Sequence, residues 1–368
     1  MATKRVLLIG PFPPPIGGDT VLTLNVSRSR YWSEHGITFE CINTSAGDRV
    51  RVPREPLTLK DVMRGGRIFL ELVAKLPRSK AVVLFANNRF VVTAGIAIIA
   101  WSRLWRRPVF LKTFGALLAG QLRETPQPWR TLTRVLLART EFVFPETKAL
   151  ERSLVEEGWL PRKRVCTLSN FLSDASFREP CAPRRFSGRC VFFGQIKQEK
   201  GVFDIIDALD GAANMSCDFY GPLLPRDRNR FLDSIANRPN LAYRGIVEPG
   251  GVSRAAASYD ILLLPTYHED EGYPAVILEA YAAGIPVIAT NWLCLPEIVE
   301  DGVEGILVPV RSPAKIRQAL EGLLADARLY ESMCLNARTF VNAFSERSVL
   351  NGILVPLVAR AVQESAAK

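Results

Sequence analysis

The chain has 368 residues, of which 48% are hydrophobic and 23% charged, and its formal net charge is +10. So many apolar side chains exclude an intrinsically disordered protein, and one core rarely serves more than about 300 residues, so two domains are expected. The positive charge points to an anionic partner: nucleic acid, an acidic membrane surface or a phosphorylated substrate.

The charge is unevenly distributed along the chain. Residues 1–180 carry a net charge of +13 and residues 181–368 a net charge of −3. We therefore expect two domains with different tasks, the basic one facing the anionic partner. The apolar run Val6–Ile9 is shorter than the roughly 7–15 residues of a signal-peptide core, and no uncharged stretch reaches the roughly 20 residues of a spanning helix. The expectation is a cytoplasmic protein, soluble or held peripherally on the inner face of the plasma membrane.

In the first half of the chain, short apolar strands alternate with longer helical patterns. Strands are predicted at Val6–Ile9, Phe39–Ile42, Ala81–Ala86, Val109–Thr113, Phe142–Phe144 and Val165–Ser169, and helices at Thr20–His35, Leu57–Leu76, Val91–Trp105 and Thr131–Ala138. This alternation predicts an α/β domain over residues 1–180, a doubly wound parallel sheet covered on both faces.

The alternation restarts after a Pro-rich stretch at 178–188, which predicts a linker. Strands are predicted at Cys190–Phe193, Cys217–Tyr220, Leu241–Tyr243, Ile261–Leu264, Pro286–Ala289 and Ile306–Val308, with helices at Val202–Leu209, Asp227–Ala236, Val252–Ala257 and Ala275–Ala283. A second Rossmann-like domain over 181–345 follows, and an amphipathic helix at about 346–368 is expected to pack back on the first. Ligands of such sheets bind outside the carboxyl ends of the strands, so the interdomain cleft is the expected site.

The segment from Glu271 to Ala280 joins a predicted strand to a predicted helix. Pro274 suits the first helical position, and the free amides behind it suit a diphosphate. Gly272 allows a close backbone approach, and Glu279, further along the helix, has the place of a carboxylate that accepts ribose hydroxyls. On spacing alone, Glu271 and Glu279 could equally be ordinary surface glutamates.

Two further loops follow strands and precede helices. In the loop after Phe193, Lys200 could neutralise a phosphate, although Glu-Lys-Gly is also a common surface turn. In the loop after Ile9, Gly17 and Gly18 let the backbone approach a ligand. The pattern there is not G-x-G-x-x-G, which disfavours a dehydrogenase.

In this order on two such domains, the three segments resemble family 4 glycosyltransferases over essentially the whole chain. The stretches Gly284–Ala289, Pro296–Val299 and Asp301–Val308 are similar to that family as well. The resemblance implies the GT-B architecture of two facing Rossmann-like domains. It also implies a retaining, metal-independent transfer from a nucleotide-diphosphate sugar, UDP- or GDP-linked, with no other cofactor.

The resemblance also implies roles for individual residues. Lys200 would bind the diphosphate and Glu271 the donor sugar as the catalytic pair, while Glu279 would hold the ribose. Backbone at Gly272, Tyr273, Pro274 and Ala275 would meet the phosphate and sugar, and Gly17 and Gly18 would approach the donor from the first domain. From its place after the predicted strand Leu241–Tyr243, Ile246 is a candidate for touching the base.

Two positions depart from the family pattern. Gln195 stands where the family usually has arginine, with Lys197 as a nearby cation, and Phe114 stands where it often has histidine. Thr113, Phe114 and His268 are therefore the weaker candidates for acceptor or substrate contacts. The acidic run at 269–271 begins a helix and is interpreted as loop and sugar contacts, and no two of the seven cysteines have Cys-x-x-Cys spacing, so no metal site is expected.

The basic first half suggests the acceptor. Lys and Arg gather beside Trp105 and Trp129 and along the helix Leu57–Leu76, a composition typical of a membrane interface. The leading hypothesis is a sugar transferase acting on a glycan or polyprenyl-linked acceptor of the cell envelope, such as lipopolysaccharide or exopolysaccharide. The alternatives are a nucleic-acid-binding or DNA-modifying glycosyltransferase and a catalytically inactive sugar-binding relative.

Overall fold

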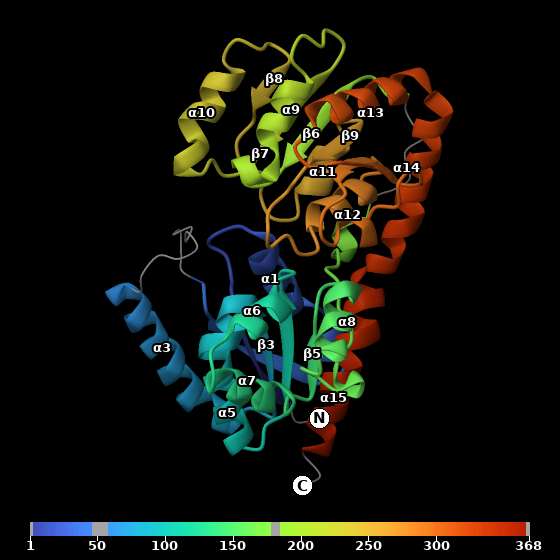
Figure 1. The fold of residues 1–368 in the computed structure, drawn as a ribbon. Helices are drawn as coiled ribbons and strands as arrows, with labels where there is room; N and C mark the ends of the chain where they lie inside the picture. The colour runs from blue at the N-terminus through green and yellow to red at the C-terminus, as the bar shows by residue number, and fades with distance from the viewer. Residues whose placement is uncertain (1–2, 46–57, 178–184, 366–368) are drawn as a thin grey trace. The chain divides into compact units, whose positions relative to one another are not determined.

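The computed structural model describes residues 3–45, 58–177 and 185–365 (Figure 1). The chain divides into two compact units, one formed by residues 1–170 with 347–368 and the other by residues 171–346. Most of the predicted linker at 178–188 lies outside the described residues. Each unit has its own parallel sheet with helices around it, which is the α/β class expected from the alternating pattern.

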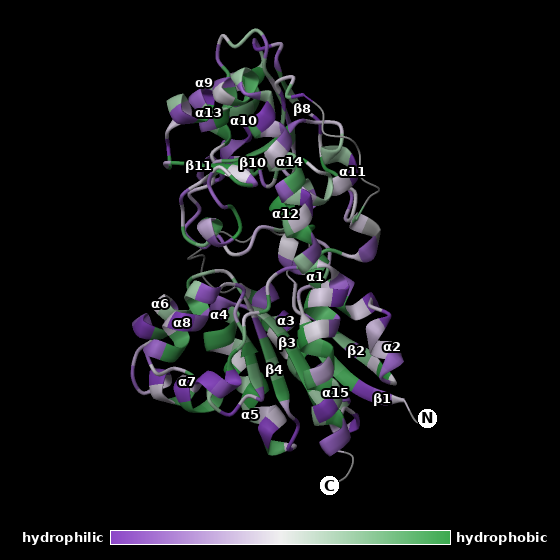
Figure 2. Cartoon of the chain, turned by 90° about the vertical axis from the view of Figure 1, so that its right-hand side faces the viewer, coloured by the Kyte–Doolittle hydropathy of each residue, from purple (hydrophilic) through white to green (hydrophobic). Residues whose placement is uncertain are grey.

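The first unit contains a five-stranded sheet in the order β2-β1-β3-β4-β5. Its strands are β1 (Lys4–Gly10), β2 (Ile37–Asn43), β3 (Ala81–Asn87), β4 (Val109–Phe114) and β5 (Phe142–Phe144). Its helices are α1 (Gly18–Arg28), α2 (Tyr31–Glu34), α3 (Leu59–Lys75), α4 (Asn88–Phe90), α5 (Ile96–Leu104), α6 (Leu118–Glu124), α7 (Trp129–Leu137), α8 (Lys148–Glu156) and α15 (Val355–Glu364). All six residues of β4 are buried, as expected for a strand covered on both faces, and Figure 2 shows the apolar strands between the helices.

Two predicted elements of this unit differ from the structure. The single helix at Thr20–His35 is broken at Ser29, whose backbone is extended, and the chain then turns to bury Trp32, whose indole N–H donates to the Val26 carbonyl at 2.8 Å. The predicted strand Val165–Ser169 contributes a single bridge, to Val143. The Leu168 carbonyl accepts instead from the Lys112 ammonium at 2.6 Å.

The second unit contains a six-stranded parallel sheet in the order β11-β10-β9-β6-β7-β8. Its strands are β6 (Arg189–Phe193), β7 (Ser216–Tyr220), β8 (Leu241–Tyr243), β9 (Ile261–Leu264), β10 (Val287–Thr290) and β11 (Gly305–Val308). Its helices are α9 (Val202–Ala208), α10 (Pro225–Ile235), α11 (Val252–Ala256), α12 (Ala275–Ala282), α13 (Pro313–Ala325) and α14 (Ala327–Val341). The strands and the first four helices were predicted within a few residues, whereas α13 and α14 were not predicted.

The strand order decides which loops meet. β6 and β9 are hydrogen-bonded neighbours, although about 70 residues separate them along the chain. Because both strands are parallel, the loop after β6 and the loop after β9 leave the same edge of the sheet side by side. Among the described residues, no helix has the length and apolar character needed to cross a membrane.

Candidate functional site

The loop after β6 carries Lys200 and is shaped by one glycine. A 3-10 turn, Gln198–Lys200, ends at Gly201, which has the left-handed backbone angle φ of +74° and leads into α9. A Cβ atom at Gly201 would lie 2.2 Å from the carbonyl oxygen of Pro265. Gly201 therefore allows the Lys200 loop to lie directly against the end of β9.

This close approach brings Lys200 to Glu271, on the loop between β9 and α12. The Lys200 ammonium lies 2.7 Å from Oε1 and 2.6 Å from Oε2 of the carboxylate, and the Thr266 hydroxyl donates to Oε2 at 2.6 Å. Glu271 is only 5% exposed. Burial alone would raise the pKa of Glu271, but the Lys200 charge and these hydrogen bonds hold it below its ordinary value. Glu271 is therefore ionised at neutral pH and fixed in place.

A second lysine, Lys197, and a histidine, His268, lie close to the Lys200–Glu271 pair, and we call these four residues the Lys200 cluster. Lys197 is buried, and its ammonium has no hydrogen bond or ion pair within the described residues. Burial, reinforced by the nearby Lys200 charge, lowers the pKa of Lys197 to about 8. Burial and the two lysines also lower the pKa of His268 to about 4, so His268 is neutral at pH 7 and can contribute hydrogen bonds but no charge.

Helix α12 supplies the remaining carboxylate. Pro274 precedes the helix, as the sequence predicts, and the helix begins at Ala275. Glu279 is half-buried and makes no hydrogen bond or ion pair within the described residues, and burial raises its pKa to about 8. A half-buried carboxylate without a partner among the described residues is available for a ligand that brings its own hydrogen-bond donors.

Side chains that sequence reasoning did not single out hold the Glu271 loop in place. The Trp292 indole N–H donates to the His268 carbonyl at 2.9 Å, and the Cys294 thiol donates to the Gly272 carbonyl at 2.6 Å. Tyr273 was predicted for its backbone, and its ring packs in the core against Phe344, with centroids 5.6 Å apart. Only the place of Thr266, just beyond a predicted strand end, could have indicated such a role from the sequence.

Two other predicted contact residues of this unit, Gln195 and Ile246, are not part of the ion pair. The Gln195 side chain is partly exposed and has no hydrogen-bond partner within the described residues. Ile246 lies in the loop after β8 and its side chain is 55% exposed.

The predicted residues of the first unit lie at the carboxyl ends of its strands. Gly17 precedes α1 and Gly18 begins it, and a Cβ atom at Gly18 would meet nothing within 4 Å. Packing of the chain therefore does not require glycine at position 18. Thr113 and Phe114, at the end of β4, are both buried, and the Thr113 hydroxyl has no hydrogen-bond partner among the residues that the structure describes.

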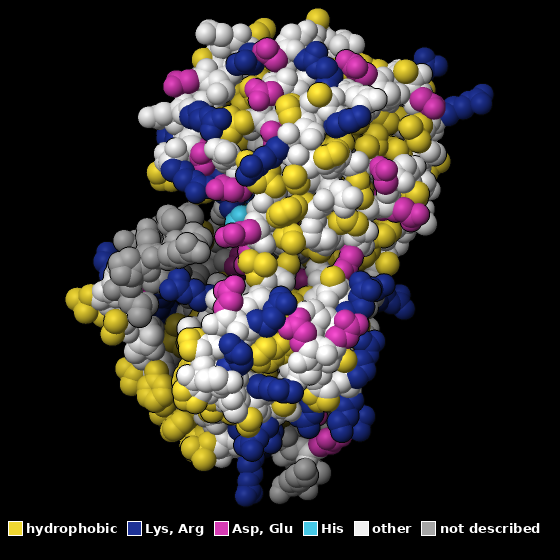
Figure 3. Space-filling view, viewed as in Figure 1, with side chains coloured by type: hydrophobic (Ala, Val, Ile, Leu, Met, Phe, Trp, Pro, Cys, Tyr) yellow, Lys and Arg dark blue, Asp and Glu magenta, His cyan; other side chains and the backbone are white. Residues whose placement is uncertain are grey.

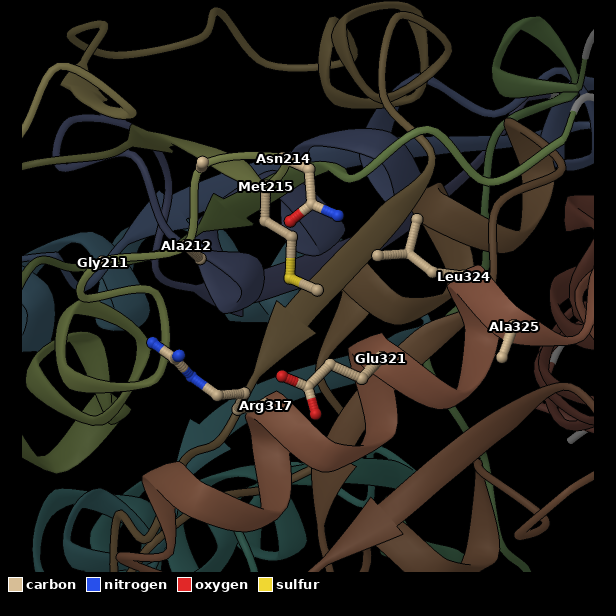
Figure 4. A pocket seen from close by; sticks show the side chains of 9 residues that line it. Gly211, Ala212, Asn214, Met215, Arg317, Glu321, Leu324 and Ala325 are labelled. Atoms are coloured by element: carbon tan, nitrogen blue, oxygen red, sulfur yellow. The ribbon is translucent and has the colours of Figure 1, made fainter.

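One pocket of the second unit contains none of the residues around Lys200 and Glu271. A pocket of about 460 Å³ lies where the chain enters β7, at the opposite edge of the sheet from the Lys200 loop (Figure 4). Its lining residues are Gly211, Ala212, Ala213, Asn214, Met215, Arg317, Glu321, Leu324 and Ala325. The Arg317 guanidinium there donates to the carbonyl oxygens of Ala208 and Asp210, so the protein itself already uses these hydrogen-bond donors.

Metal-ligating residues do not gather in the part of the chain that is described. No group of three or more His, Cys, Asp or Glu side chains there could hold a metal ion, and the six described cysteines form no disulfide.

Known proteins share sequence and fold with this chain. The family described as Glycosyl transferases group 1 matches residues 187–326. A D-inositol 3-phosphate glycosyltransferase of Paenarthrobacter aurescens is 36% identical over 110 residues, which cover 27% of this chain and 26% of that protein. The match thus spans about a quarter of that relative's length.

Solved structures resemble the whole chain. A sucrose-phosphate synthase from Thermosynechococcus elongatus has a TM-score of 0.74 at 16% identity, covering 99% of this chain and 100% of that one. The Anabaena protein HepE in complex with UDP-glucose has a TM-score of 0.68 at 16% identity and 99% coverage of both chains. The two Rossmann-like units therefore define a protein of the GT-B glycosyltransferase fold. Residues 187–326 match the glycosyl transferases group 1 family, and over these residues the family resemblance predicted from the sequence is confirmed.

Proposed function

We propose that the chain transfers a sugar from a nucleotide-diphosphate sugar to a glycan or polyprenyl-linked acceptor of the cell envelope, with retention of anomeric configuration and without a metal ion. The observation that carries the proposal is the grouping of the Lys200–Glu271 pair with the start of α12 and the unpartnered Glu279. HepE, which has the same fold, has been solved with UDP and with UDP-glucose.

The chemistry follows from charge. The bond between the anomeric carbon and the diphosphate oxygen breaks, and both bonding electrons leave with the nucleoside diphosphate. The acceptor hydroxyl forms the new bond to carbon and releases its proton to the leaving group. Fixed cations and backbone amides directed at the diphosphate stabilise the negative charge that develops there. Lys200 supplies such a charge, while Glu271 orients it and offers oxygen atoms to sugar hydroxyls.

A thermal-shift panel of UDP, GDP, ADP and their sugars tests the donor. Binding of one nucleotide to the folded state raises the melting temperature, and Glu279→Ala should remove the shift. Turnover with an acceptor, followed by NMR of the product anomer, tests retention, and activity that persists in EDTA tests metal independence. A sugar-binding relative without activity would bind the donor but give no transfer. No shift with any nucleotide would refute the proposal.

The surface of α3 supports an anionic membrane as a partner of the first unit. Leu59, Val62, Met63 and Leu70 project from one face of this helix, and each is more than 60% exposed, whereas Ile68 and Leu72 are buried. Figure 3 shows apolar side chains gathered over this region. An amphipathic helix normally turns its apolar stripe toward the core. Here a second apolar stripe faces solvent.

Basic residues surround that stripe. The segments 59–75, 96–107 and 129–139 contain ten Lys and Arg but two carboxylates. The ring centroids of Phe69 on α3 and Trp101 on α5 lie 6.0 Å apart, and α5 packs on α7. Pairing of two copies through this face would bring like charges together, whereas an anionic bilayer complements it.

Vesicle flotation tests the membrane partner. Binding should require anionic lipid, should weaken in high salt, and should be lost when Met63 and Leu70 are both replaced by Ser. Leu335, exposed on α14 of the other unit, is the control position for the same substitution. Equal binding to neutral and anionic vesicles, or no binding to either, would refute this part of the proposal.

A further inference from the structure

Lys197 is a buried lysine that makes no hydrogen bond or ion pair within the described residues, although the charges of Glu199 and Glu271 act on its ammonium. Its side chain lies in the second unit at 8% exposure, and its ammonium has neither a carboxylate nor a carbonyl partner in the described part of the chain. Its neighbour Lys200, by contrast, is matched by Glu271. Burial of a lysine without a partner is costly, which makes such a residue a candidate for binding a ligand.

The backbone conformation around Lys197 indicates on which side of the chain its side chain lies. Ile196 bridges to Leu223 as a short extended segment, and its side chain is fully buried in the core of the second unit. Lys197 itself is extended, with φ of −153° and ψ of 156°. Side chains alternate along an extended chain, so those of Gln195 and Lys197 lie on the same side, opposite to Ile196. The turn that follows then brings Lys200 back, its N–H donating to the Lys197 carbonyl at 3.1 Å.

We propose that Lys197 is a second diphosphate-binding residue of this site, reaching the ligand beside Gln195 and Lys200. The inference rests on the proposed function, since it assigns a partner to the same nucleotide-diphosphate sugar. Without ligand, the Lys200 cluster and its charged neighbours hold the three cations Lys197, Lys200 and Arg226 against the two carboxylates Glu199 and Glu271, and a diphosphate supplies the missing negative charge. Gln195 adds amide donors without adding charge.

Binding of a diphosphate by Lys197 should change the number of protons that the protein holds. The charged groups that act on its ammonium lie on the turn, on the β9–α12 loop and on α10: Lys200, Glu199, Glu271 and Arg226, with His268 acting as a neutral neighbour at pH 7. With its pKa at about 8, Lys197 is about half protonated at pH 8. A bound diphosphate favours the ammonium, so binding takes up about half a proton there. A phosphate with a pKa near 6 is already ionised at this pH and does not contribute.

Calorimetric titration with UDP, GDP and their sugars at pH 8, in buffers of different ionisation enthalpy, tests the proposal. Wild type should bind one nucleotide and take up about half a proton more than Lys197→Met does, because Glu279, whose pKa is also about 8, contributes equally in both proteins. Lys197→Met should bind about tenfold or more weakly, because a charge-assisted contact is lost. Lys197→Arg should retain most of the affinity. Lys315→Met, which removes an exposed lysine of α13, should bind as wild type does.

The unliganded melting temperature separates binding from a structural role. Removing an unpaired buried charge should leave the melting temperature of Lys197→Met unchanged or higher. Unchanged affinity and proton uptake in Lys197→Met would overturn this inference while leaving the proposed function intact, as would a lower melting temperature with unchanged affinity. Failure of wild type to bind any of the nucleotides would overturn the proposed function, and this inference with it.

Discussion

Replacing Glu279 by Gln should stabilise the unliganded protein while weakening nucleotide binding. Burial raises the pKa of Glu279 from 4.5 to about 8, so folding disfavours the carboxylate. Each pKa unit corresponds to about 1.4 kcal/mol, which gives about 3 kcal/mol at pH 7 and about 5 kcal/mol above pH 8 as upper values. Glutamine has nearly the same shape and no charge, so the variant escapes this cost.

The stability advantage of Glu279→Gln over wild type should depend on pH in a defined direction. Between the unfolded pKa of 4.5 and the folded pKa of about 8, the unfolded chain binds fewer protons at this group, so wild type loses stability as pH rises. Below about pH 4.5 both states hold the proton, and the advantage of Glu279→Gln should vanish. Above about pH 8 the advantage should be constant.

Scanning calorimetry of wild type and Glu279→Gln at about pH 5, 7 and 8.5 measures the effect. At neutral pH the transition of the second unit should rise by roughly 6–12 °C at most, from about 2–4 °C per kcal/mol for a domain of this size. Glu321→Gln, on the exposed face of α13, is the control. An advantage equal at pH 5 and pH 8.5, or a variant less stable throughout, would refute the reasoning. Nucleotide affinity should fall about tenfold or more as the ribose loses a charged acceptor.

Two further substitutions test the geometry around Lys200. Lys200→Met should cost about 3–5 kcal/mol of unfolding free energy because it leaves the Glu271 carboxylate buried without its ammonium, and Lys200→Met/Glu271→Gln should recover much of that loss. Denaturant unfolding of the two single variants and the double variant gives the coupling, and additive losses would contradict the ion pair. Gly201→Ala should destabilise the protein far more than Gly211→Ala in the same assay. Both glycines have positive φ, which costs an L-residue about 1–2 kcal/mol, but only at Gly201 would the new Cβ collide with the Pro265 carbonyl. Equal losses would show that the close approach is not rigid.

The sequence predicted the elements best where local pattern and packing agree. The continuous apolar runs became β1, β3 and β4, and the predicted helix at Ala275–Ala283 matches α12 within one residue. The break at Ser29 was missed because it depends on burial of Trp32, a tertiary effect that no local periodicity reports. A strand at Val165–Ser169 was predicted from propensity alone, and a single long-range contact from Lys112 competes with it.

For the site, the sequence indicated which residues matter more readily than how they interact. Lys200 and Glu271 were singled out by their places after strands, and the neighbouring β6 and β9 bring them into contact. Their mutual ion pair depends on Gly201 and could not be read from spacing. Two other features also arise only from the tertiary fold, so the sequence did not show them. Lys197 is buried without a partner, and the Cys294 thiol binds the backbone of the Glu271 loop.

The first unit is assembled from both ends of the polypeptide, and this has a consequence for synthesis. α15 packs with β3 and buries Val355, Val358 and Val362, although more than 250 residues separate it from that strand. On the ribosome, the N-terminal sheet must therefore wait for almost the entire chain to emerge before this helix covers it. The second unit, contiguous in sequence, is under no such delay. A fragment ending near residue 170 should expose an apolar surface and aggregate, and supplying residues 347–368 as a fused segment should rescue it.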